Sequence, residues 1–174
     1  MKNSITNLQV GCTNYARLFS IVIILSLVAP FITNAQTGKT DFSGSWKFNE
    51  SKSELGDRGR RFGNGDIVAR QDANLLTIER EFTRDGQTST FTSKYDLGGK
   101  ETTNSFGRGE SKSAAKWSSD GQSLTVTTKM SFNGNERTST DVWSLKDANT
   151  LSVASTRQGR DGGEMKTTRV YDKK

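Results

Sequence analysis

The stretch SLTVTTKMSF, residues Ser123–Phe132, alternates between two kinds of side chain along its whole length. Every second residue from Leu124 onward is apolar or Thr, and the residues between them are Thr, Lys or Ser. A period of two is typical of a β-strand with one buried face, whereas an α-helix shows a period near 3.6 residues. This stretch therefore predicts a strand that turns Leu124, Met130 and Phe132 toward an interior.

The same alternation recurs through residues 36–174, interrupted by turn dipeptides such as Asn133-Gly134 and Asp161-Gly162. Such pairs tolerate the positive φ angles that tight hairpins need. Strands are predicted at residues 42–48, 66–71, 75–84, 87–97, 100–106, 110–118, 123–132, 136–145, 150–157 and 164–171. The mostly short loops favour an antiparallel meander, with one long irregular connection at residues 49–65.

The predicted inner faces are apolar but are broken by Arg80, Arg137, Arg157 and Arg169. A dry sandwich of two sheets would bury these charges at a cost of several kcal/mol each. A closed barrel with an internal cavity tolerates them, because water or a ligand can solvate them. An outer-membrane barrel fits less well, since the outward faces are rich in Thr, Lys and Glu. The expected fold is all-β, a single up-and-down barrel of eight to ten strands.

Residues 1–35 have the layout of a secretory signal peptide. Lys2 and Arg17 give a basic start, LFSIVIILSLVAPFI (Leu18–Ile32) is apolar, and small residues precede Gln36. Cleavage is expected between Ala35 and Gln36, which leaves one barrel domain at 36–174 in the periplasm or outside the cell. An uncleaved anchor is the alternative, but the apolar run is shorter than the ~20 residues of a membrane-spanning helix.

Composition narrows the function classes. The chain has no His, and its one Cys and one Pro both lie within residues 1–35. Nucleophilic triads that contain His or Cys and conventional zinc sites are therefore excluded from the mature domain. Removal of Lys2 and Arg17 lowers the net charge from +6 to +4, which is weak for a nucleic-acid-binding protein. No metal, cofactor or catalytic residue is predicted, although an enzyme based on paired carboxylates stays a minor alternative.

Two terminal motifs carry a family resemblance. FSGSWKFN (Phe42–Asn49) resembles the first strand of calycin barrels, the superfamily of lipocalins and fatty-acid-binding proteins. TTRVYDKK (Thr167–Lys174) is similar to the last strand of fatty-acid-binding proteins. The whole chain also resembles small secreted bacterial proteins of lipocalin-like sequence. The lid helices of the fatty-acid-binding proteins have no counterpart, because residues 49–65 are too few for two helices.

The resemblance implies roles for particular residues. Trp46 would close the base of the barrel, with Gly44 allowing close backbone approach. Arg169 and Tyr171 would either bind a ligand carboxylate or act structurally, Arg169 by lying across Trp46 and Tyr171 as a core aromatic residue. The candidate ligand-binding residues are Arg169, Tyr171, Arg80, Arg137, Arg157, Met130 and Phe132.

The leading hypothesis is a monomeric binding protein for a small hydrophobic or amphipathic ligand, with or without a carboxylate. The alternative is an envelope interaction module whose loops contact a protein or a glycan. The two differ in what Arg169 does, because only a carrier needs this side chain for ligand affinity.

Overall fold

The computed structural model describes residues 38–56, 64–84, 87–106, 109–132, 135–158 and 163–174, and the predicted signal peptide and cleavage site lie outside them. The described residues belong to one compact unit, Thr37–Lys174. Its strands are β1 (Gly44–Glu54), β2 (Ile67–Gln71), β3 (Leu75–Arg84), β4 (Gln87–Asp96), β5 (Thr102–Phe106), β6 (Gly109–Trp117), β7 (Ser123–Phe132), β8 (Asn135–Asp147), β9 (Thr150–Gln158) and β10 (Glu164–Lys173).

The ten predicted strands are confirmed, and their ends agree within two residues except at β1. That strand continues to Glu54, so the prediction of an irregular connection from Asn49 onward was wrong for its first residues. A register irregularity between Asn49 and Glu54 interrupts the pairing of β1 with β10. The Ser53 hydroxyl restores one contact there by accepting a hydrogen bond from the Val170 amide at 2.9 Å. The part of β1 that follows Asn49 therefore stays attached to β10 through a bulge.

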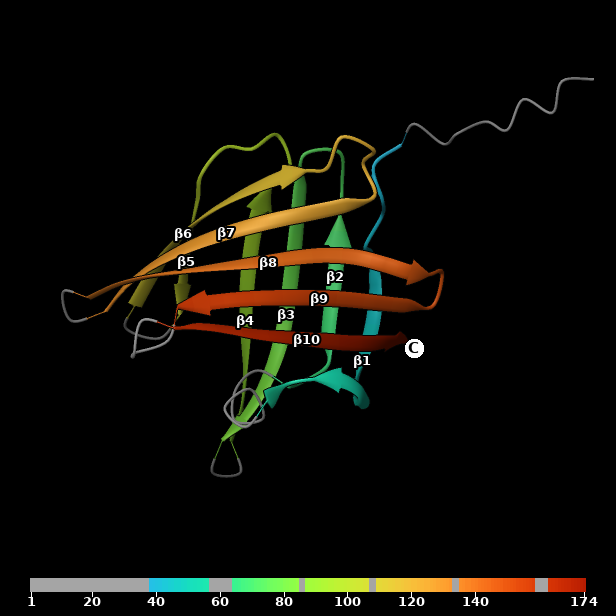
Figure 1. Ribbon diagram of the computed structural model, residues 1–174, viewed down its shortest axis with the longest axis horizontal. Helices are drawn as coiled ribbons and strands as arrows, with labels where there is room; N and C mark the ends of the chain where they lie inside the picture. Colours follow the sequence, from blue (N-terminus) through green and yellow to red (C-terminus); the bar gives the residue numbers. More distant parts are fainter. Residues whose placement is uncertain (1–37, 57–63, 85–86, 107–108, 133–134, 159–162) are drawn as a thin grey trace, which may run out of the picture. The chain divides into compact units, whose positions relative to one another are not determined.

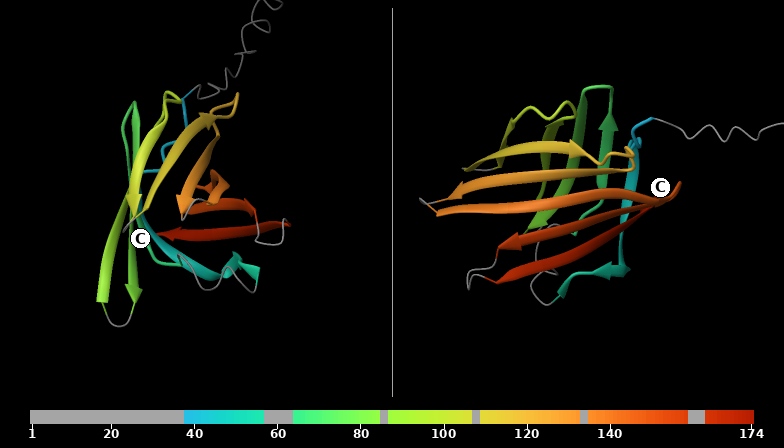
Figure 2. Two further views of the ribbon diagram at one scale, coloured as in Figure 1. Left: turned by 90° about the vertical axis from the view of Figure 1, so that its left-hand side faces the viewer. Right: turned by 45° about the horizontal axis from the view of Figure 1, so that its top comes forward.

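All ten strands form one antiparallel sheet in the order β4-β3-β2-β1-β10-β9-β8-β7-β6-β5. The pairing of β1 with β10 joins the two ends of the domain. In Figure 1, β7–β10 cross in front of β1–β4, and Figure 2 shows these two groups facing one another. The sheet is thus rolled into a nearly closed barrel, as predicted. Among the described residues, no helix is long and apolar enough to cross a lipid bilayer.

The barrel is completed by side chains where β4 meets β5, the two strands at the ends of the sheet order. The Asn104 side chain donates to the Lys94 carbonyl at 3.0 Å and accepts from the Lys94 amide at 2.7 Å. The Thr102 hydroxyl donates to the same carbonyl at 2.8 Å. One carboxamide thus takes the place of a peptide group in a strand ladder, which satisfies backbone groups that an open edge would expose.

An aromatic cluster fills one end of the barrel, which we call the base; the opposite end is the rim. Phe42 stacks on Trp117 with ring centroids 5.8 Å apart and meets the edge of Trp143 at 6.2 Å. Trp46 is fully buried and donates its indole N–H to the Phe42 carbonyl at 2.9 Å. This hydrogen bond holds the Trp46 ring beside Phe42 within the cluster.

Gly44 permits the close packing at the base. Its φ angle is +147°, a conformation that residues with a Cβ rarely adopt. A Cβ at this position would lie 3.3 Å from the Lys173 side chain, whose ammonium lies 5.5 Å from the centre of the Trp46 ring. The Gly-x-Trp spacing therefore serves the local backbone and the aromatic contact together.

We expect Gly44→Ala to lower the free energy of unfolding by about 1–3 kcal/mol, because Ala is strained at this φ and crowds Lys173. Urea unfolding followed by tryptophan fluorescence measures the loss. Gly38→Ala is the matched control, since a Cβ there meets nothing within 4 Å. Equal stabilities of the two variants would contradict this account of the base.

Candidate functional site

The inner face of the barrel changes character between base and rim. On β9 it reads Leu151, Val153, Ser155 and Arg157, of which the first three are buried and Arg157 is exposed. β8 follows the same order, from buried Trp143 through half-buried Asp141 to exposed Arg137. On β7, likewise, the buried Leu124 and Val126 give way to half-buried Met130. The inner face of β7–β9 therefore becomes more exposed from base to rim, with polar side chains in its middle.

Four side chains bring charge and hydrogen-bonding groups to the middle level: Arg80 from β3, Asp141 from β8, Ser155 from β9 and Arg169 from β10. Arg169 keeps only 6% of its surface exposed and Ser155 3%, while Arg80 and Asp141 are half-buried. The Ser155 hydroxyl donates to the Asp141 carboxylate at 2.5 Å. Adjacent strands position this pair, because Asp141 and Ser155 are direct partners in the β8–β9 ladder.

Arg169 is the most buried guanidinium among the described residues, and its environment disfavours its charge. Burial lowers the pKa of Arg169, and the neighbouring guanidinium groups of Arg157 and Arg80 lower it further, whereas Tyr171 and Asp141 oppose this. The side chain remains protonated near neutral pH because an arginine pKa lies so far above it. Arg169 also donates a hydrogen bond to the Thr167 hydroxyl at 3.4 Å. A guanidinium at this depth is a suitable donor group for the anionic part of a ligand.

Several buried donors at the middle level or nearer the base have no protein partner among the described residues. Among the described residues, no hydrogen bond reaches the Tyr171 hydroxyl, the Arg80 Nε or the Trp143 indole N–H. Tyr171 is fully buried and meets the ring of Phe48 at 5.7 Å, so packing holds its ring in place. A buried donor without a partner costs about 1–3 kcal/mol, and native proteins rarely retain several together. These groups can bind a ligand that carries acceptor atoms.

Tyr95 on β4 adds a further phenol near the same charges. Burial raises the pKa of Tyr95, and the Asp141 carboxylate raises it further, while a hydrogen bond with Ser93 and the charge of Arg80 oppose this. The phenol therefore stays neutral near pH 7. Its place in the β3–β4 ladder, opposite Leu76, puts it between the apolar base and Arg80.

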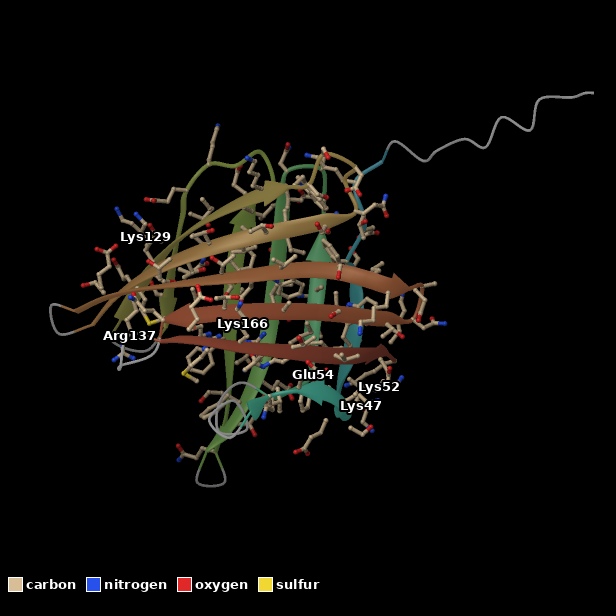
Figure 3. The ribbon with its side chains drawn as sticks, in the orientation of Figure 1. Lys47, Lys52, Glu54, Lys129, Arg137 and Lys166 are labelled. Atoms are coloured by element: carbon tan, nitrogen blue, oxygen red, sulfur yellow. The ribbon has the colours of Figure 1, made fainter. Side chains whose placement is uncertain are left out.

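The structure separates the predicted ligand-binding residues by depth. Tyr171, Arg169 and Arg80 lie at the middle level or just below it. Met130 is half-buried, and Arg137 and Arg157 are exposed at the rim, as Figure 3 shows for Arg137. Phe132 ends β7, and its side chain lies outside the described part of the structure.

The basic side chain that lies over the Trp46 ring is Lys173, two residues beyond Tyr171. Arg169 lies at the middle level with Asp141 and Arg80.

Sequence reasoning missed Tyr95, Ser155 and the contact between Ser155 and Asp141. All three residues occupy inward-facing positions in the alternating pattern of their strands, and this was the only indication that the sequence offered. Parity alone could not rank them, because it selects about half of the residues of every strand.

A depression lies on β6–β8 and is lined mainly by outward-facing side chains. This depression, of about 210 Å³, is lined by Glu110, Lys112, Lys129, Met130, Ser131 and Glu136. Its charged side chains are exposed and of both signs, and Lys112 forms an ion pair with Glu101 at 3.5 Å. The inner face, by contrast, combines buried charge with unsatisfied donors, and we therefore place the candidate site there. Among the described residues, no cluster of three or more His, Cys, Asp or Glu side chains could hold a metal ion.

The comparisons with known proteins support the fold. No family model and no curated protein sequence matches this chain. Among solved structures, the wild-type fluorescent protein UnaG aligns with a TM-score of 0.52 and 18% identity, covering 76% of this chain and 97% of its own. A single-site mutant of UnaG aligns with a TM-score of 0.51 and 21% identity, with coverages of 76% and 96%.

We expect the unsatisfied and the satisfied hydroxyls of the site to respond differently to removal. Tyr171→Phe should leave the free energy of unfolding unchanged or raise it by up to about 1 kcal/mol, since no described partner is lost. Ser155→Ala should lower it by about 1–2 kcal/mol, because the Asp141 carboxylate loses its donor. Chemical denaturation of the ligand-free protein tests both, and a larger loss for Tyr171→Phe would show that its hydroxyl is already engaged.

UnaG is a β-barrel of the fatty-acid-binding-protein family, and at these identities the similarity establishes the architecture alone. Together with the strand order and the Trp46 base, it shows that this chain has a calycin-like β-barrel fold.

Proposed function

We propose that this protein is a non-catalytic binding protein that holds a small amphipathic anion, such as a fatty acid, inside its barrel. The observation that carries the proposal is the buried Arg169 guanidinium beside donors that lack described partners. Burying such a charge costs several kcal/mol unless an anion or strong hydrogen bonds compensate it. Asp141 supplies one negative charge at this level, against the positive charges of Arg80 and Arg169.

The layout of the inner face suits an amphiphile. The anionic group of the ligand would lie at the middle level, where Arg169 offers a planar set of donors that matches a carboxylate and the Tyr171 hydroxyl adds another. The hydrocarbon part would run toward the rim beside Met130 and Phe82, both half-buried on the inner face. Calycin-like barrels offer the geometry for such a site, because their inner side chains converge on one axis.

We expect Arg169→Gln to weaken the binding of dodecanoate by about tenfold to a hundredfold, because a charge-assisted hydrogen bond is lost. Asp141→Asn should tighten binding by about fivefold, since it removes a like charge while its amide oxygen still accepts from Ser155. Isothermal titration calorimetry measures both effects.

Arg70→Gln is the matched control for the loss of one positive charge. Arg70 lies on the outer face of β2 and pairs with Glu79. Its replacement should leave affinity unchanged. Equal losses for Arg169→Gln and Arg70→Gln, or no binding of dodecanoate by the wild type, would refute the proposal.

Export of the domain is part of the proposal and rests on residues 1–35 alone. We expect N-terminal sequencing of the mature protein from its native cell envelope or medium to begin at Gln36, because the small residues before it suit signal peptidase. A mature protein that keeps Met1 or remains in the cell interior would overturn this assignment.

A further inference from the structure

Positive charge dominates the inner wall that β7–β10 build. By ladder register, the charged side chains on this wall above Lys173 at the base are Arg137, Asp141, Arg157 and Arg169, so three guanidinium groups face one carboxylate. Asp141 and Arg169 share the middle level described above. One ligand carboxylate at that level would compensate Arg169 and leave the two rim arginines without a role. This excess of positive charge favours a ligand that carries a second anionic group.

Arg137 and Arg157 lie close enough to act on one group. Arg157 pairs with Ser139 across the β8–β9 ladder, and Arg137 lies two residues further along β8 on the same face. Val153 is the ladder partner of Arg169, and Arg157 follows it by four residues. At about 3.3 Å per residue, the backbone of Arg157 therefore lies about 13 Å along the strand from the Arg169 level. The backbone of Arg137 lies about 20 Å from it, because Trp143 is the β8 residue at that level.

The rim arginines have no ionic partner among the described residues. Neither Arg137 nor Arg157 forms an ion pair with any carboxylate in the described ranges. Some basic side chains elsewhere, though not all, do have such partners: Lys52 with Asp172 at 2.8 Å, Lys174 with Asp66 at 3.0 Å and Lys166 with Glu164 at 3.4 Å. The rim guanidinium groups are thus available to an external anion.

Apolar side chains lie beside the rim arginines and on the facing strands, whereas the wall between the two cationic levels carries Ser155 and Thr167. Met130 is the ladder partner of Arg137, and Met165 is the partner of Arg157. On β3 and β4, Phe82 and Phe91 pack edge to face at 6.4 Å, and Phe91 leaves 39% of its surface exposed. A ligand with an anionic group at each end can place its apolar part against these side chains.

We propose that the ligand of this barrel carries two anionic groups, one bound at the Arg169 level and the second by Arg137 and Arg157 at the rim. The ligand class is a dianionic amphiphile, in its simplest form a long-chain α,ω-dicarboxylate. This inference rests on the proposed function and adds a second subsite to it. The fork of a guanidinium binds carboxylate oxygens in pairs, so two arginines can bind one terminal carboxylate from two sides.

The test compares dodecanedioate with dodecanoate by isothermal titration calorimetry. The wild type should bind the diacid more tightly, although the diacid has one methyl group fewer to bury. The double variant Arg137→Gln/Arg157→Gln should weaken the binding of dodecanedioate about tenfold. It should change the affinity for dodecanoate less than about twofold. The loss of dodecanedioate affinity in this double variant should also become smaller at high salt, because exposed ion pairs are screened.

Lys129→Gln/Lys166→Gln is the matched control. It removes the same charge from the outer faces of β7 and β10, and Figure 3 labels both lysines. It should alter neither affinity. If the control weakens the diacid as much as the rim variant does, general electrostatic attraction explains the effect and the inference fails.

The remaining outcomes separate the two proposals. Tight binding of dodecanoate with no preference for the diacid overturns the second subsite and leaves the proposed function standing. Loss of both acids in the rim variant also overturns it, since the arginines would then act on the ligand as a whole. Failure of the wild type to bind either acid overturns both proposals.

Discussion

The ladder between β1 and β10 is the constraint on which the site depends. It joins the two ends of the domain, with Trp46 opposite Lys173 and Phe48 opposite Tyr171. A shift of one residue in this register would turn Arg169 and Tyr171 to the outer face, because successive side chains of a strand point to opposite sides. The contact of the Lys173 ammonium with the Trp46 ring and the buried packing of Tyr171 both favour the observed register.

The inner face combines two demands that conflict in a small protein. The apolar cluster at the base supplies the burial that stabilises the barrel, in a domain where only about a quarter of the residues are apolar. At the middle level, the burial of Arg169 and of donors without described partners lowers the free energy of unfolding. Proteins keep such destabilising groups where function needs them. A ligand that binds only the folded state raises the free energy of unfolding by mass action.

The junction of β4 and β5 shows how local chemistry can replace a strand ladder. Lys94 directs its backbone amide and carbonyl to the Asn104 side chain, which carries one acceptor and one donor group in a fixed plane. A carboxamide is the side chain closest in geometry to a peptide unit, so it satisfies both backbone groups at once. The barrel can therefore close although no strand pairing joins β4 to β5 among the described residues.

The alternating pattern by itself determined the ten strands and which residues face inward. These properties follow from the period of two in an extended chain and from turn residues, which are local. The alternating pattern could not distinguish Arg169 from Arg157 or Arg137, because all three occupy inward-facing positions of their strands. Their depth depends on which strand ends pack against the aromatic base, and that depends on ladders between segments distant in sequence. The same holds for Lys173 above Trp46 and for the Asp141–Ser155 contact: only the closed barrel brings these residues together, because register across strands is a tertiary property.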